Sequence, residues 1–341
     1  MFSKDKDIYY FFFYWLILSL IIVFFIIIVG GLTRLTNSGL SITEWELFRG
    51  VLPPLNNTSW QYYFNEYKKI PQFKIINNNI TLQEFKIIFY WEYFHRILAR
   101  LIGLFFLIPL IYFYLSKKIN KKYIQTCFFI FGLIVAQGFM GWYMVQSGLV
   151  NNISVSHYRL SIHLVTALII ASTIFWLIYN VKEKQNIIFF NFSKKNIPFL
   201  VLIFLLFTQI ILGAFVSGLD AGLIYQTWPM MGDTFIPNDI FTINIKNILK
   251  FDNHSLVQFY HRNLAYMITI YILLLGFYIY IKKLTNLYNP LKIIIIFLLI
   301  QISLGIFTLV SGLNIYLASA HQISSVLLVF SALNLYYLRT N

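Results

Sequence analysis

Eight long apolar runs limit the folds open to this chain. A run of about 20 apolar residues forms a helix that can cross a hydrocarbon core about 30 Å thick. Composition agrees, because 59% of the 341 residues are hydrophobic and only 11% are charged, which is typical of a polytopic membrane protein. We therefore predict an all-α membrane protein with eight transmembrane helices, at residues 8–31, 86–115, 123–147, 156–180, 197–219, 256–281, 290–312 and 315–338.

Lysine clusters between these runs predict the orientation of the chain in the bilayer. They lie at residues 117–122, 182–195 and 282–283, which are alternate connections. Cytoplasmic connections carry an excess of Lys and Arg, so these connections and both termini are predicted to be cytoplasmic. The two long connections, 32–85 and 220–255, then lie outside.

The formal net charge of +14 would also suit a nucleic-acid partner. Because much of this charge sits in short clusters beside apolar runs, we attribute it to topology and contact with acidic lipids of the bilayer, and expect no nucleic acid. The first run ends without a small-residue cleavage site, and no transit peptide precedes it. We therefore expect a multi-pass protein of a bacterial inner membrane. The single cysteine, Cys127, excludes an intramolecular disulfide and a Cys-based metal site, and is expected to be a small buried residue.

The sequence contains an internal repeat. The pattern Gln-x-x-x-Gly begins at Gln137 and again at Gln301, 164 residues later, and both copies are followed by Ser-Gly-Leu at the same spacing. Because each half has four spans, an even number, both halves begin on the same side of the membrane and have the same orientation. We predict two tandem four-helix bundles, residues 1–180 and 181–341, related by a pseudo-twofold axis along the membrane normal.

Four histidines lie near the outer ends of the even-numbered helices, at matching depth. They are His95, His163, His261 and His321, and each lies 18 to 22 residues before the first basic residue at the inner end. A lone intramembrane histidine is most often a polar group in a helix interface. Two parallel helices with one histidine each at equal depth can instead ligate one haem iron from both sides. The sequence thus predicts haem sites at His95 with His163 and at His261 with His321. The remaining two, His157 and His254, are expected to be solvated beside the outer loops.

Three arginines accompany these histidines. Arg96 and Arg262 directly follow His95 and His261, and Arg159 lies one turn outward of His163. Guanidinium groups bind carboxylates in bidentate fashion, so these arginines are candidate partners of haem propionates. The alternative is that they extend to the outer headgroups.

Glu92 breaks the repeat. It lies three residues before His95, on the same helix face, whereas the equivalent position of the second half holds Gln258. Ionisable groups inside a membrane are costly and indicate function. A carboxylate can accept or relay a proton, which an amide cannot, so the first half is predicted to react and the second to hold a cofactor. The alternative is that Glu92 pairs with a neighbouring arginine or a backbone donor.

Several long segments of the chain resemble the haem A synthase family, in the form of its mitochondrial and alphaproteobacterial branch. They are residues 30–42, 50–55, 92–96, 137–149, 158–164, 221–231, 257–266 and 321–322. The chain departs from the family in three details: the first outer loop has no cysteine pair, residues 45–48 read Trp-Glu-Leu-Phe, and Gln226 stands where Asn is common.

The resemblance implies a reaction, a cofactor and partners. Members oxidise the C8 methyl of haem O to a formyl group by successive hydroxylations, which gives haem A for terminal oxidases. By position, Glu92 would be the acidic residue essential to turnover, His95 and His163 would line the substrate haem site, and His261 and His321 would ligate a haem b. A haem O synthase and an electron acceptor would be partners, and a homo-oligomer stays open.

Two other functions stay open from the residues alone. The duplicated histidine pairs would also suit a b-type cytochrome that transfers electrons between a quinol and a partner protein. A transporter is disfavoured, because the repeats are parallel rather than inverted and the helices show no obvious break at mid-membrane.

Overall fold

The computed structural model describes residues 2–44, 49–149, 153–241, 248 and 250–341. Across these ranges the secondary structure is helical, with one isolated β-bridge between Met231 and Thr234. The Trp-Glu-Leu-Phe departure at residues 45–48 lies outside the described residues. The predicted all-α fold is therefore confirmed for the part of the chain that the structure describes.

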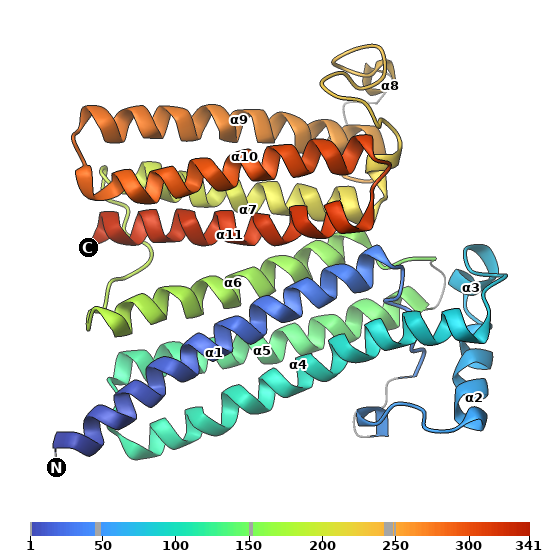
Figure 1. The fold of residues 1–341 in the computed structure, drawn as a ribbon, viewed down its shortest axis with the longest axis horizontal. Helices are drawn as coiled ribbons and strands as arrows, with labels where there is room; N and C mark the ends of the chain where they lie inside the picture. Colours follow the sequence, from blue (N-terminus) through green and yellow to red (C-terminus); the bar gives the residue numbers. More distant parts are fainter. Residues whose placement is uncertain (1, 45–48, 150–152, 242–247, 249) are drawn as a thin grey trace. The chain divides into compact units, whose positions relative to one another are not determined.

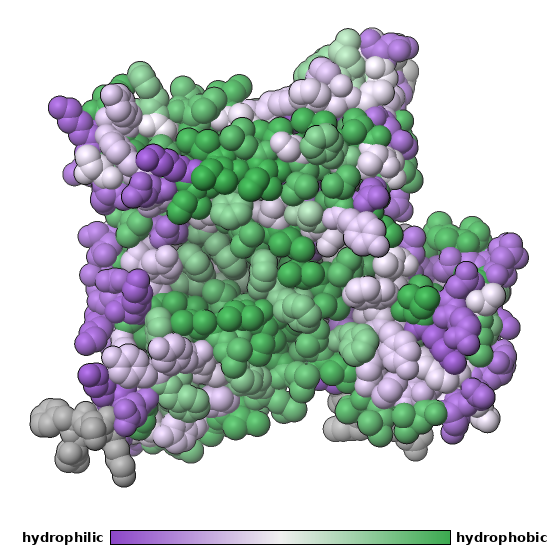
Figure 2. Space-filling view, viewed as in Figure 1, coloured by the Kyte–Doolittle hydropathy of each residue, from purple (hydrophilic) through white to green (hydrophobic). Residues whose placement is uncertain are grey.

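Within the described ranges, eight helices are long and apolar enough to cross a membrane, as predicted. They are α1 (Phe2–Leu35), α4 (Leu82–Ser116), α5 (Lys121–Leu149), α6 (His157–Lys182), α7 (Ile197–Gly218), α9 (His254–Ile281), α10 (Tyr288–Val310) and α11 (Ile315–Thr340). In Figure 2 the visible sides of these helices carry mostly hydrophobic residues, and hydrophilic residues gather near the helix ends. A protein with this surface is a multi-pass membrane protein.

The chain divides into two compact units, Met1–Val181 and Lys182–Asn341. In the first unit α1 packs along α4, and α4 packs against α5 (Figure 1). In the second unit α7 packs along α9, α10 packs along α11, and α11 also contacts α7. Each unit thus contains four of the long helices. The pseudo-twofold relation between the units stays a prediction.

Helix α4 begins earlier than the apolar run predicts, at Leu82 rather than residue 86. Thr81 and Glu84 form a capping box, in which the Thr81 hydroxyl accepts from the Glu84 amide and the Glu84 carboxylate accepts from the Thr81 amide. Such a box satisfies two of the free amides at a helix start. The added turn extends α4 beyond its apolar run, where the segment between α1 and α4 packs against it.

The segment between α1 and α4, which is predicted to lie outside and is called the first outer segment below, is folded rather than a simple loop. It contains the short helices η1 (Arg49–Val51), α2 (Asn57–Tyr67) and α3 (Pro71–Ile75), which lie at the outer end of α4 (Figure 1). Trp60 and Phe64 of α2 pack against Phe85 and Phe89 of α4 in tilted and edge-to-face ring contacts. Isolated helices this short are unstable, so the aromatic contacts with α4 hold α2 in place.

The segment between α7 and α9, predicted to be the second outer segment, carries less regular structure in its described residues. It contains η2 (Ala221–Leu223) and α8 (Asn238–Phe241). A further short helix, η4 (Thr285–Leu287), joins α9 to α10. Asn253 caps α9 by accepting a hydrogen bond from the Leu256 amide at 2.9 Å. The start of α9 lies beside α8 (Figure 1), and α9 also contacts η2.

Candidate functional site

Glu92 lies on α4 where the first outer segment folds back onto the helix. Its side chain is 3% exposed, and its carboxylate accepts four hydrogen bonds. Oε2 accepts from the Ser41 hydroxyl at 2.7 Å and from the Ile42 amide at 2.9 Å. Oε1 accepts from Nε and Nη2 of Arg96, at 3.0 and 2.5 Å. Every one of these partners is a donor, so the pocket suits an ionised carboxylate.

Arg96 stands one helical turn after Glu92, so the two side chains share a face of α4. The ion pair is buried, because the side chains are 10% and 3% exposed. Nη2 of Arg96 also donates to the Ile42 carbonyl at 3.0 Å. Glu92 therefore pairs with an arginine, which was one of the two interpretations open from the sequence, and the propionate role of Arg96 stays a prediction.

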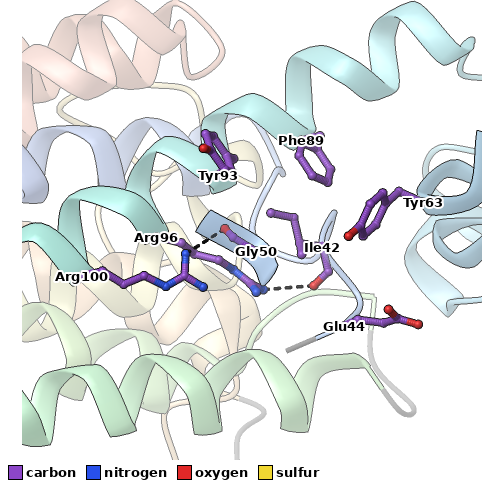
Figure 3. A pocket seen from close by; sticks show the side chains of 8 residues that line it. All are labelled: Ile42, Glu44, Gly50, Tyr63, Phe89, Tyr93, Arg96 and Arg100. Carbon is purple, nitrogen blue, oxygen red and sulfur yellow. Dashed lines mark hydrogen bonds between the residues drawn. The ribbon is translucent and has the colours of Figure 1, made fainter. Parts of the chain in front are cut away.

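A hollow beside this ion pair opens between α4 and the first outer segment (Figure 3). Arg100 donates from Nη1 to the Gly50 carbonyl at 3.1 Å, and Tyr93 donates its hydroxyl to the Val51 carbonyl at 2.6 Å. The outer segment is thereby tied to more than one turn of α4. The hollow is lined by Ile42, Glu44, Gly50, Tyr63, Phe89, Tyr93, Arg96 and Arg100.

The buried tyrosine of α2 lies within electrostatic reach of the ion pair. Burial raises the pKa of Tyr67, the hydrogen bond from Asn77 lowers it, and the Glu92 charge raises it. Tyr67 donates to Gln72 Oε1 at 3.0 Å, and the Gln72 amide donates to the Asn37 carbonyl at 3.2 Å. These bonds connect α2 to the chain that leaves α1.

The second unit has an amide where the first has the carboxylate. Gln258 is 2% exposed and donates from Nε2 to the Tyr225 carbonyl at 2.9 Å, while its buried Oε1 has no hydrogen-bond partner. Arg262, one turn later, donates to the same Tyr225 carbonyl at 2.9 Å and to the Met230 carbonyl at 3.1 Å. The outer segment here is held by an amide and a guanidinium, which cannot exchange a proton as a carboxylate can.

The structure brings the four intramembrane histidines together in two pairs. His95 of α4 and His163 of α6 have ring centres 6.4 Å apart, and His261 of α9 and His321 of α11 have ring centres 6.5 Å apart. An imidazole nitrogen binds a metal ion at about 2.0–2.1 Å, so two imidazoles on opposite sides of one ion have ring centres roughly 6 Å apart. Both pairs therefore have the spacing that one iron between them requires.

Each of these rings lies against a glycine on the membrane-spanning helix that precedes its own. A Cβ atom added to the glycine would meet ring atom Cε1 at 2.9 Å for Gly30 and His95, 3.2 Å for Gly141 and His163, 3.1 Å for Gly213 and His261, and 3.0 Å for Gly305 and His321. Real Cβ atoms essentially never come within 3.0 Å of another heavy atom, and contacts of 3.0 to 3.2 Å are tighter than most. The glycines therefore form the space in which the four rings sit.

The residues present fit a haem at both pairs. All four histidines have a buried Nδ1 without a hydrogen-bond partner, which costs about 1–3 kcal/mol per group unless a ligand or a proton acceptor offsets it. Among the described residues no cluster of three or more His, Cys, Asp or Glu side chains could hold a metal ion. Two histidines supply only two ligands, so the remaining positions of an iron must be filled by a group such as a porphyrin.

Other residues named from the sequence lie apart from these contacts. The Arg159 guanidinium lies 4.8 Å from the ring centre of Tyr143, and its propionate role stays a prediction. His157 is buried and lies against Tyr158 in a tilted arrangement with ring centres 4.1 Å apart, so its expected exposure is wrong. His254 is exposed. Cys127 is a buried free cysteine, as expected.

Two sets of site residues were missed from the sequence. Ser41 and Ile42 reach Glu92 from about 50 positions away along the chain, and no periodic pattern reports such a contact; only their place in the segment 30–42 marked them. The glycines that face the histidines carry a weak signal, because Gly141 and Gly305 occur at the same place in the repeated Gln-x-x-x-Gly pattern. A glycine without its facing helix does not show what it makes room for.

Known proteins resemble the chain along most of its length. A relative from Pelagibacter ubique is 49% identical over 318 residues, covering 92% of this chain and 91% of the relative. Relatives from Flavobacterium johnsoniae and Wolbachia pipientis are each 42% identical, covering 88% and 91% of this chain and 89% and 87% of the relatives. All three are named haem A synthase. The family described as cytochrome oxidase assembly protein matches residues 13–333, and the chain belongs to this family.

Proposed function

We propose that this protein is a haem A synthase, which oxidises the C8 methyl group of haem O to a formyl group and so makes haem A for terminal oxidases. The relatives that carry this name match about nine tenths of the chain. The observation that carries the proposal is the buried Glu92–Arg96 pair beside one histidine pair, with Gln258 in its place in the other unit. It is an oxidoreductase acting on a methyl group: two hydroxylations give a geminal diol, which loses water.

In this proposal the first unit binds the substrate. His95 and His163 hold haem O by its iron, and the glycines that face them set the ring positions. Arg159 and Arg96 lie near the outer ends of the same helices, where guanidinium groups bind propionates. Glu92, held by Ser41 and Ile42, accepts protons that leave the methyl carbon as it is oxidised.

The second unit would hold a haem b as its cofactor. His261 and His321 would ligate its iron, and Arg262 is a candidate partner for a propionate. When bound, this haem supplies one-electron transfer, as iron between two axial histidines commonly does. Because Gln258 cannot titrate, this unit passes electrons and does not take up the protons of the reaction.

The protein would lie in a bacterial inner membrane, in the orientation that its lysine clusters favour. Residues 117–122, 182–195 and 282–283 would be cytoplasmic with both termini, and the haem sites would lie near the outer face. Partners are then a haem O synthase, which releases the substrate, and an electron acceptor. A homo-oligomer is compatible with this arrangement.

The test is haem A formation in a host that makes haem O and has no haem A synthase of its own. Haems are extracted and separated by chromatography with mass detection, and the amount of haem A per protein is compared between wild type and Glu92→Gln. We expect haem A with wild type and a fall of at least about 100-fold with Glu92→Gln, as for the loss of a proton-transfer group.

The matched control is Gln258→Glu, which makes the reverse exchange of amide and carboxylate at the equivalent position of the second unit. We expect it to keep haem A formation within about threefold of wild type, because that position takes no proton in the reaction. Equal haem A formation by wild type and Glu92→Gln would contradict the assigned role. Absence of haem A from wild type, with haem b in both units, would favour the b-type cytochrome instead.

A further inference from the structure

A glutamine on the neighbouring helix contacts three of the four intramembrane histidines. Each glutamine stands one helical turn before the glycine that faces the ring. In the first unit Gln137 donates from Nε2 to the His163 carbonyl at 2.8 Å. In the second unit Gln209 donates from Nε2 to the His261 carbonyl at 3.0 Å, and the same Nε2 lies 3.4 Å from His261 Nε2.

The third glutamine holds its histidine through a serine as well. Gln301 Nε2 lies 3.3 Å from His321 Nε2. Its Oε1 accepts a hydrogen bond from the Ser324 hydroxyl, which also lies 3.1 Å from the His321 carbonyl. Both histidines of the second unit thus have a glutamine amide at the ring and at or near the backbone.

The fourth histidine lacks this contact. On α1, Ile26 stands one turn before Gly30, at the place that a glutamine takes on α5, α7 and α10. Polar contacts between α1 and α4 lie elsewhere: the Thr33 hydroxyl donates to the Trp91 carbonyl at 3.2 Å, and the Trp15 indole donates to the Phe105 carbonyl at 3.2 Å. His95 therefore has the facing glycine and no glutamine.

Two of the glutamines also have an acceptor oxygen without a partner, and the amide of Gln209 must rotate to present it to the ring, because its nitrogen faces His261 Nε2. A metal-bound imidazole almost always donates its second N–H to an oxygen, which fixes the ring and strengthens the ligand. The buried Oε1 atoms of Gln137 and Gln209 have no hydrogen-bond partner, and neither do the Nδ1 atoms of His163 and His261. An aliphatic side chain at position 26 cannot provide such an acceptor.

We propose that Gln137, Gln209 and Gln301 are positioning residues that fix His163, His261 and His321 as iron ligands, and that Ile26 leaves His95 as the ligand that exchanges. The inference rests on the proposed function in one respect, that haem binds between the histidines of each pair. It adds a reason for the different roles of the units: the second unit retains its haem with two fixed ligands, and the first can release its haem after one ligand leaves.

Carbon monoxide tests the exchange directly, because it binds ferrous haem only where an axial ligand comes off. Purified holoprotein loaded with haem is reduced and mixed with CO, and the binding phases are followed by their absorbance. The phase lost in His163→Ala belongs to the first unit. We expect that phase to be at least about tenfold faster than the phase of the second unit in wild type, a difference of about 1.4 kcal/mol.

Two substitutions then move the rates in opposite directions. Ile26→Gln should slow the first-unit phase about tenfold, and the matched control Ile26→Leu should leave it unchanged. Gln209→Met, which keeps the length of the side chain and removes its hydrogen bonds, should speed the second-unit phase by a similar factor. This variant decides the question alone if Ile26→Gln does not accumulate.

Equal CO rates for the two units of wild type would overturn the proposal, as would a second-unit phase that Gln209→Met leaves unchanged. So would an Ile26→Gln protein that behaves like Ile26→Leu. None of these rates depends on haem A formation. Failure of the proposed synthase activity, seen as haem A made equally by wild type and Glu92→Gln, is therefore distinguishable from failure of this inference.

Discussion

Glu92 and Gln258 occupy the same place in their units and hold an outer segment in different ways. In both units an arginine one turn later donates to a carbonyl of that segment, Arg96 to Ile42 and Arg262 to Tyr225, at 3.0 and 2.9 Å. In the second unit the Gln258 amide donates to the same carbonyl. In the first the carboxylate accepts from the segment instead.

The comparison shows that holding such a segment does not require a buried carboxylate. An amide with a guanidinium does so in the second unit, without the cost of removing a carboxylate from water, which is several kcal/mol per ion. The first unit bears that cost and offsets it with four donors to Glu92. Proton transfer is a property that the carboxylate has and the amide lacks, so the proposed role of Glu92 as a proton acceptor would account for the difference.

The largest expected effect comes from removing the counter-charge. Arg96→Met leaves the Glu92 carboxylate buried without its ion pair, which should lower the free energy of unfolding by about 3–5 kcal/mol. The double variant Glu92→Gln/Arg96→Met should recover most of that loss, because the first unit then has neither charge. Denaturant unfolding in mixed micelles measures both. A double variant as unstable as Arg96→Met alone would show that the arginine acts through its packing.

A second prediction separates the two haem sites. Gly30→Ala places a methyl 2.9 Å from His95, and Gly213→Ala places one 3.1 Å from His261. Overpacking of this kind costs about 1–3 kcal/mol, so each variant should weaken haem binding in its own unit by roughly 5- to 150-fold. Haem O and haem b per protein, measured after extraction, should fall separately in the two variants.

The control for these variants is Gly103→Ala on α4, because a methyl there meets nothing within 4 Å. It should keep both haems. Loss of haem b in Gly30→Ala, or of haem O in Gly213→Ala, would contradict the assignment of one haem to each unit.

The membrane-spanning helices could be predicted because bilayer thickness fixes their length. Their ends were less accurate where local polar contacts extend them. α4 begins at Leu82 because Thr81 and Glu84 cap it, and α1 continues to Leu35, past the predicted residue 31. The Thr-x-x-Glu pattern is a recognisable cap, so that error was avoidable. Helix α2 was missed because its stability comes from contacts with α4 and not from its own sequence.

The candidate site could be predicted as far as depth and residue type allow. His95 and His163 were expected to lie at one depth, and the structure places their rings together. The sequence did not reveal the donors around Glu92, because Ser41 approaches from an outer segment 51 positions away. Depth along a helix follows from counting residues, whereas the fold of a segment outside the bilayer depends on its tertiary contacts.

A third prediction concerns one of the four donors to Glu92. Ser41→Ala removes the hydroxyl that lies 2.7 Å from Oε2, and a lost hydrogen bond to a buried charged group should cost about 1.5–3 kcal/mol of unfolding free energy. The matched control is Ser19→Ala, because Ser19 is equally buried and bonds only to the Trp15 carbonyl of its own helix. That variant should change stability by less than about 0.5 kcal/mol.

Ser41→Ala also distinguishes the two explanations of the Glu92 pocket. If the donors serve to hold the outer segment, the remaining bonds from Ile42 and Arg96 suffice. Haem A formation should then fall only as much as the folded fraction of the protein falls. If they serve to set the position and charge of a proton acceptor, haem A formation should fall further than the folded fraction does. We expect the second result, because the Gln258 pocket holds its segment without any donor to a carboxylate.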